Sequence, residues 1–101
     1  MLDKRIKFDD SYTNEELGIT TLYFIAPTDL FDNIDEDAES VEISIECPTE
    51  YISADYATVE CSPTKYFEED GCYVDYDWRE ISLLYEEIEA FIKLAEESER
   101  M

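Results

Sequence analysis

Acidic side chains are the groups in this sequence whose number and spacing could do chemistry. The 101 residues carry 28 Asp and Glu against 7 Lys and Arg, and no histidine. Histidine is the usual acid–base residue at neutral pH and the usual partner of a Ser or Cys nucleophile, so those catalytic arrangements are excluded. Asp75 and Asp77 resemble a glycosidase carboxylate pair, but such pairs are inevitable in a chain this acidic. The glycines, Gly18 and Gly71, form no phosphate-cradling loop, so we expect a protein that is not an enzyme and has no cofactor.

The most acidic run of the chain is the best candidate for a cation site. When the EF-hand calcium loop is aligned from Asn33, Asp35 and Asp37 fall at ligand positions. However, Ala38 replaces the required glycine and Ser44 stands where the bidentate glutamate belongs. Weak incidental binding of divalent cations is the most that this run predicts, and we assign no metal site.

The three cysteines, Cys47, Cys61 and Cys72, are an odd number without CxxC spacing. With no histidine beside them, they favour neither zinc binding nor a disulfide framework. We expect buried, reduced thiols. The longest uninterrupted apolar run covers only residues 22–26, so the sequence predicts no signal peptide or membrane span and a cytoplasmic protein.

Residues 8–64 contain fifteen carboxylates and no basic residue. The net charge of −21 far exceeds the magnitude of about 2 to 8 that keeps a small domain soluble, and it destabilises the compact state by self-repulsion. Such a field repels phosphates, which excludes direct binding to nucleic acid. It attracts proteins with a basic channel, and nucleic-acid-binding proteins are the commonest of these. We therefore expect a basic DNA- or RNA-binding protein as the partner.

Residues 41–46 show the clearest strand pattern, because Val41, Ile43 and Ile45 alternate with polar residues. This alternation buries one face and turns Glu42 and Glu46 to the other. Further strands are predicted at residues 4–8, 19–26, 52–61 and 72–76. Residues 19–26 are expected to form a central strand covered on both faces. Pro63 is expected to end the strand over residues 52–61. Single helical turns are expected around residues 13–17, before Gly18, and around residues 29–31.

The end of the chain predicts a helix over residues 78–97, about 30 Å long. Asp77 and Glu80 have capping-box spacing at its start. Its main apolar stripe consists of Ile81, Leu84, Tyr85, Ile88, Phe91, Ile92 and Ala95. A second ridge of Leu83, Ala90 and Leu94 either widens this stripe or offers a contact surface for a partner or a second copy, and hence a dimer.

Together these elements predict one α+β domain over residues 1–101, an antiparallel sheet of about 4–5 strands with a long C-terminal amphipathic helix packed across it. One sheet face would carry Glu42, Glu46 and Glu60, with acidic loops at its rim. The residues expected to bind the partner are Asp35, Glu36, Asp37, Glu39, Glu42, Glu46, Glu60, Glu68, Glu69 and Asp70.

In its size, its lack of a catalytic motif and its acidic alternating segment Val-Glu-Ile-Ser-Ile-Glu, the chain resembles the small acidic inhibitors that phages and other mobile elements use against host defence. These are the anti-CRISPR proteins that act on Cas nucleases and the DNA-mimicking anti-restriction proteins. The resemblance implies that the protein occupies a DNA-binding cleft, such as the arginine-lined PAM-reading site of a Cas9.

Two other interpretations remain open at this point. The charges could form a solvated surface without a partner, as runs of charge usually do. Alternatively, the protein could be an immunity protein or antitoxin that neutralises a cationic toxin, whose capture electrostatic steering would accelerate.

Overall fold

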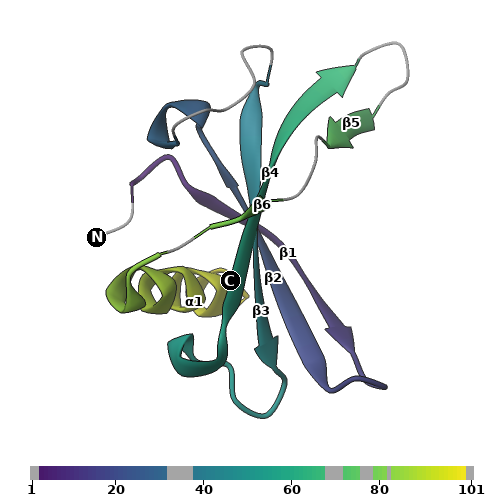
Figure 1. Cartoon of the computed structure of the whole chain (residues 1–101), viewed down its shortest axis with the longest axis vertical. Coiled ribbons are helices and arrows are strands. Elements are labelled where there is room, and N and C mark those ends of the chain that lie inside the picture. Colours follow the sequence, from purple (N-terminus) through teal and green to yellow (C-terminus); the bar gives the residue numbers. More distant parts are fainter. Residues whose placement is uncertain (1–2, 32–37, 68–71, 76–78, 82, 100–101) are drawn as a thin grey trace.

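The computed structural model describes residues 3–31, 38–67, 72–75, 79–81 and 83–99. In chain order the elements are β1 (Lys7–Asn14), β2 (Ile19–Ala26), the 3-10 turn η1 (Thr28–Leu30), β3 (Ser40–Pro48), the 3-10 turn η2 (Ala54–Tyr56), β4 (Thr58–Phe67), β5 (Cys72–Asp75), β6 (Arg79–Glu80) and α1 (Tyr85–Glu99) (Figure 1). The expected α+β class, an antiparallel sheet followed by one C-terminal helix, is confirmed.

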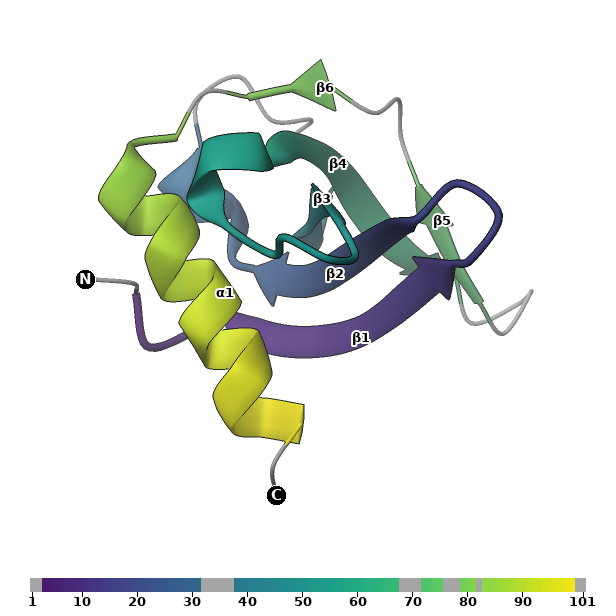
Figure 2. The ribbon, with the colours of Figure 1, turned by 90° about the horizontal axis from the view of Figure 1, so that it is seen from below.

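The four longer strands form an antiparallel meander in the order β1-β2-β3-β4. The short strands β5 and β6 both pair with β4, at its C-terminal and N-terminal halves respectively. The sheet curls, and α1 lies across its open side (Figure 2). The buried apolar side chains of the described residues form one cluster between the curled sheet and the helix.

The alternating segment of β3 is packed as its pattern predicts. Val41, Ile43 and Ile45 are fully buried and face Ala26, Phe24 and Leu22 of β2 through direct cross-strand pairs. The residues between them on β2 are only half-buried. Residues 19–26 were expected to be covered on both faces; their second face is only partly covered.

The first hairpin differs from its prediction. The first strand begins at Lys7 and continues to Asn14, whereas the sequence predicted a strand over residues 4–8 and a helical turn after it. Residues 15–18 form the hairpin turn, in which the Asn14 side-chain oxygen accepts a hydrogen bond from the Leu17 amide at 3.2 Å. Gly18 closes the turn at φ 65°, a conformation that glycine adopts without strain. Pairing with β2 keeps the polar residues 10–14 in an extended strand, because it outweighs their weak local preference for a helical turn.

The strand β4 begins and ends later than the sequence predicts. Residues 54–56 form η2 instead of strand, and β4 continues through Pro63 to Phe67. The Ile81 amide donates to the Val59 carbonyl at 3.2 Å, so odd-numbered residues of β4 direct their backbone groups away from β3. Pro63 points the same way, between the positions that pair with β6 and with β5. None of the described backbone hydrogen bonds of β4 with its neighbouring strands requires an N–H at residue 63. Proline, which lacks that N–H, therefore does not interrupt the strand.

The helix starts seven residues later than expected and spans 15 residues, so the prediction of a long helix from residue 78 is wrong. Arg79 and Glu80 pair with β4 instead of entering the helix. At the helix start the Glu87 carboxylate accepts a hydrogen bond from the Leu84 amide at 3.1 Å, which is one of the two bonds of a capping box; Leu84 has no side-chain acceptor for the other. Asp77 lies outside the described residues, and Glu80 belongs to β6.

The helix packs on the sheet through Ile88, Phe91, Ile92 and Ala95, all buried. The Phe91 ring meets the Phe24 ring edge-on at 4.9 Å, and Phe24 in turn meets Phe8 at 5.6 Å. This aromatic row connects α1, β2 and β1 through the centre of the core.

Two of the residues assigned to the apolar stripe of the helix are exposed. Leu84 is 66% exposed and Tyr85 is 48% exposed, because the helix only begins there. For the second ridge of Leu83, Ala90 and Leu94, the structure supports the reading that it widens the core-facing stripe. Leu83 precedes the helix, and both leucines pack, partly buried, against the core.

The thiols of Cys47 and Cys61 are buried, as expected. Burial is the main cause that raises the pKa of the Cys47 thiol. Both residues lie on the core face of the sheet, where they pack as small apolar side chains.

Candidate acidic binding face

The register between β3 and β4 brings three predicted glutamates to one face. Ser44 pairs with Glu60, and Glu42 and Glu46 lie two residues to either side of Ser44 along β3. All three side chains therefore point away from Ile43, Ile45 and the core. We call this surface of β1 to β4, opposite the core, the outer face.

A fourth carboxylate joins the outer face through a β-bulge. The register of β1 against β2 shifts between Phe8 and Asp10, so that Phe8 faces the core opposite Phe24 and Asp10 pairs with Tyr23. Strict alternation from Phe8 would have turned Asp10 toward the core. Sequence reasoning missed Asp10 for this reason, and only the pairing with β2 reveals its place.

Tyr23 lies among these carboxylates and responds to them. Its pKa is raised, first by burial and then by the negative charges of Glu42, Glu46 and Asp10. The phenol thus indicates that these carboxylates act together at one point of the outer face. Sequence reasoning missed this role, because Tyr23 stands in a segment that is apolar at nearly every position.

A shallow hollow of about 250 Å³ opens on the outer face, lined by Thr21, Tyr23, Ser44, Glu46 and Glu60. Its walls offer hydroxyl and carboxylate oxygens, which are hydrogen-bond acceptors for arginine and lysine. The arrangement suits the recognition of cationic side chains.

The remaining predicted binding residues lie at the rim. Glu39 is exposed just before β3, where its backbone amide donates to the Thr64 carbonyl at 2.8 Å. The other six lie outside the described residues: Asp35, Glu36, Asp37, Glu68, Glu69 and Asp70. The acidic rim that they were expected to form stays a prediction.

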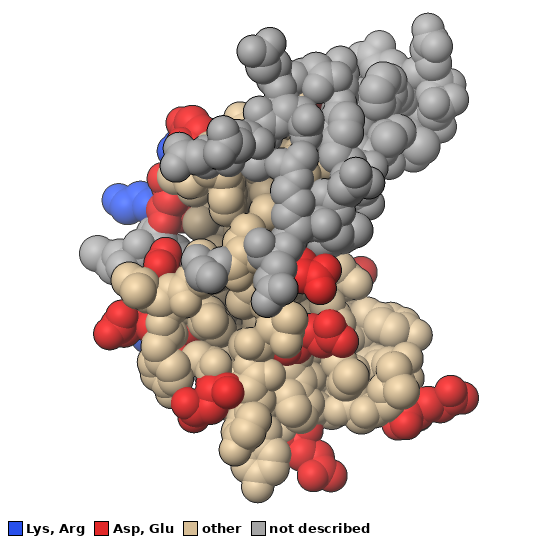
Figure 3. Space-filling view, viewed as in Figure 1, with Lys and Arg blue, Asp and Glu red and all other residues tan. Residues whose placement is uncertain are grey.

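Basic side chains near the outer face are few. Lys7 pairs with Ile25 and so lies at one end of the face. Arg5 is held by Asp3 at 3.0 Å and by Asp29 at 2.9 Å. Hydrogen bonds from Arg5 lower the pKa of Asp3. On the face seen in Figure 3, acidic side chains are scattered over the described part of the surface, whereas basic atoms are visible only at the left edge.

Other chemistry has little support among the described residues. They contain no group of three or more Cys, Asp or Glu side chains placed to hold a metal ion. Asp75 belongs to β5, and Asp77, its predicted partner, lies outside the described residues. No helix in the described ranges has the length and apolar character needed to cross a membrane.

Comparison of the chain with protein-family models, with curated proteins and with solved structures gives no significant match.

Proposed function

We propose that the protein is a non-enzymatic inhibitor that mimics the charge of DNA and occupies the basic nucleic-acid-binding cleft of a nuclease or another DNA-binding protein. The observation that carries this proposal is the gathering of Glu42, Glu46, Glu60 and Asp10 on one side of the sheet. The anti-CRISPR and anti-restriction inhibitors, which this chain resembles in charge and size, are the corresponding functional class.

The spacing of charges on a sheet supports this proposal. Residues i and i+2 of a strand repeat at about 6.8 Å, and neighbouring strands lie about 4.8 Å apart. Phosphates along one strand of B-DNA repeat at about 3.4 Å along the axis. Glu42 and Glu46 stand four residues apart on β3, a span of about 13.6 Å, and Glu60 of β4 stands opposite the residue midway between them. Along the strand direction a carboxylate therefore recurs about every 6.8 Å, close to twice the phosphate interval, so basic side chains arranged for DNA would find acceptors at commensurate intervals.

The rigidity of the sheet is a second support. Glu42 and Glu46 flank the buried Ser44 on β3. The opposite face of this strand packs in the core through Ile43 and Ile45. Charges on such a strand are held in position before binding, which reduces the entropy lost when a partner docks. A flexible acidic tail would lack this advantage.

Pull-down from a host lysate, repeated with duplex DNA as competitor, tests the function. We expect recovery of a DNA-binding protein that duplex DNA displaces, with an affinity that falls as salt rises. Recovery of a small cationic toxin that DNA does not displace would contradict the proposal and favour an immunity protein or antitoxin.

Charge reversal tests the site. Replacing Glu42, Glu46 and Glu60 by lysine should weaken binding to the recovered protein by at least about tenfold, because each change adds repulsion inside a basic cleft. The matched control reverses Glu15, Glu16 and Glu50, which are exposed in turns at the end of the sheet. It changes the net charge equally and should alter the affinity less. Equal losses in both triple variants would show that only the total charge matters.

A further inference from the structure

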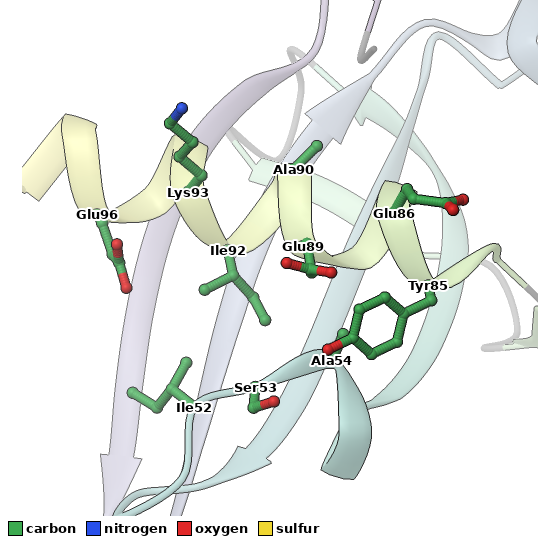
Figure 4. A pocket seen from close by; sticks show the side chains of 10 residues that line it. All are labelled: Ile52, Ser53, Ala54, Tyr85, Glu86, Glu89, Ala90, Ile92, Lys93 and Glu96. Atoms are coloured by element: carbon green, nitrogen blue, oxygen red, sulfur yellow. The ribbon is translucent and has the colours of Figure 1, made fainter.

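A groove runs between α1 and the segment that contains η2. Its volume is about 530 Å³, and its lining includes Ile52, Ser53, Ala54, Glu89, Ile92 and Glu96. Figure 4 shows that Tyr85, Glu89, Ile92 and Glu96 all point from the helix toward residues 52–54. The groove thus combines apolar surface with two carboxylates directed into it.

Large apolar side chains are exposed around this groove. Tyr51 is 64% exposed and Tyr56 is 61% exposed, and their rings lie 5.9 Å apart. Ile52, Leu84 and Tyr85 are exposed as well. Five of the eight exposed large hydrophobic residues in the described part of the chain therefore belong to residues 51–56 or to the start of α1. Exposed tyrosines in such a cluster are typical of protein-binding surfaces.

The groove is negatively charged. The pKa of Tyr85 is raised, mainly by the negative charge of Asp55 and then by that of Glu89. Glu89 and Glu96 have no ion-pair partner among the described side chains. Lys93 also borders the groove, but its side chain points away from residues 52–54 in Figure 4. Two carboxylates beside apolar surface are therefore left for a cation from outside.

We propose that this groove binds a cationic segment of a partner protein, in which the apolar stem of an arginine or lysine lies along Ile52, Ala54 and Tyr85 and its charged head meets Glu89 and Glu96. Arginine and lysine combine an apolar stem with a charged head, which matches the composition of the groove. The exposed Tyr85 ring, which lines the groove, adds cation–π attraction for the same side chain. Acidic lipid headgroups are repelled by the groove's carboxylates, and a second copy of the chain is disfavoured by a net charge of −21 on each molecule.

The groove and the outer face are separate surfaces. The helix covers the core side of the sheet, whereas Glu42, Glu46 and Glu60 lie on the opposite side. Both surfaces can be occupied at once. The groove therefore does not rest on DNA mimicry, and its test contains no DNA-binding protein.

Titration of the isotope-labelled protein with a short amphipathic peptide of arginine and leucine tests the groove. At about 150 mM NaCl, where long-range attraction is screened, we expect amide chemical shifts to change at residues 52–56 and 85–96. A peptide with serine in place of each leucine keeps the charge and should bind at least about fivefold more weakly, since it lacks apolar contacts. Shift changes spread over all acidic surfaces, or equal affinity for both peptides, would overturn the proposal.

Matched variants localise the binding. Tyr85→Ala should weaken the arginine–leucine peptide by about threefold to fivefold, whereas Leu17→Ala, at an exposed apolar residue of the hairpin turn, should not. Glu89→Gln with Glu96→Gln should give a similar loss, and Glu15→Gln with Glu16→Gln should not. Thermal melts check that each variant folds. Unchanged affinity in both groove variants, or self-association through residues 52–56, would refute the assignment.

Discussion

Individual carboxylates matter in this protein through the side chains that they surround. Tyr23 is the clearest example, since burial and three nearby acids raise its pKa together. Tyr23 lines the hollow of the outer face together with Glu46 and Glu60. The ionisation of this tyrosine therefore reports the electrostatic state of the proposed binding face.

The raised pKa of Tyr23 predicts a loss of stability at alkaline pH. The folded protein holds the phenol proton of Tyr23 more tightly than the unfolded chain does. The resulting contribution to the unfolding free energy is therefore complete below the ordinary tyrosine pKa of about 10, and it is lost as pH rises through the higher pKa of Tyr23 in the folded protein. Urea unfolding at about pH 8 and pH 11 should show a larger decline in the unfolding free energy for the native protein than for Tyr23→Phe. An identical decline in both would mean that the Tyr23 pKa is not raised.

Glu46 should contribute to that shift in a measurable way. Replacing Glu46 by glutamine removes one of the negative charges near the phenol, so the pKa of Tyr23 should fall toward its ordinary value. Titration of the labelled Tyr23 ring by NMR measures this change. Glu16→Gln, in the hairpin turn, is the control and should leave the titration of Tyr23 unaltered.

At the scale of elements, the contact between helix and sheet depends on the aromatic row of Phe8, Phe24 and Phe91. Phe91 is buried, and its ring is the helix's edge-on contact with β2. Leu84, just before the helix, is mostly exposed. The core therefore depends on Phe91, whereas Leu84 follows the helical spacing of apolar residues without being buried.

Truncation of these two residues should have very different effects. Phe91→Ala should cost about 3–5 kcal/mol of unfolding free energy, because it leaves a cavity beside Phe24. Leu84→Ala should change stability by no more than about 0.5 kcal/mol. Urea denaturation followed by far-UV circular dichroism measures both. A large loss at Leu84 would indicate that the helix begins earlier and that this side chain is buried.

The helix boundary shows how sequence periodicity can mislead. Ile81, Leu84 and Tyr85 continue the spacing of Ile88 and Phe91 without a break, so local pattern favours one helix. However, the outward edge of β4 needs hydrogen-bond partners, and residues 79–81 provide them. This tertiary requirement outweighs the modest helix propensity of a few residues.

For the whole molecule, the net charge of −21 is spread over a compact body with a radius of gyration of 13.7 Å. Repulsion between carboxylates must then oppose folding, and screening ions must relieve it. Binding to a basic partner would relieve it in the same way. Salt should therefore stabilise the free protein and weaken its complex.

Thermal stability should rise with salt. Between about 20 and 200 mM NaCl we expect the melting temperature to increase on the order of 5 °C, which corresponds to about 1 kcal/mol for a domain of this size. The variant Glu42→Gln, Glu46→Gln, Glu60→Gln carries less charge and should show a smaller increase. A melting temperature that stays flat or falls in this range would contradict the role of self-repulsion.

Much of the architecture follows from the sequence alone. Alternation at Val41, Ile43 and Ile45 determined the core face of β3 and turned Glu42 and Glu46 outward, because strand side chains alternate by geometry. The limits of β2 and the presence of a C-terminal helix followed from apolar pattern and from Pro27. The excess of acid, from which we proposed a basic partner, is read from the sequence alone.

Tertiary structure decided where strands pair and therefore which charges meet. The register of β3 against β4 placed Glu60 beside Ser44, and the bulge in β1 added Asp10 opposite Tyr23. The groove between α1 and η2 likewise joins residues that are distant in the chain. Such pairings depend on backbone hydrogen bonds and core packing between segments, which local residue patterns do not encode.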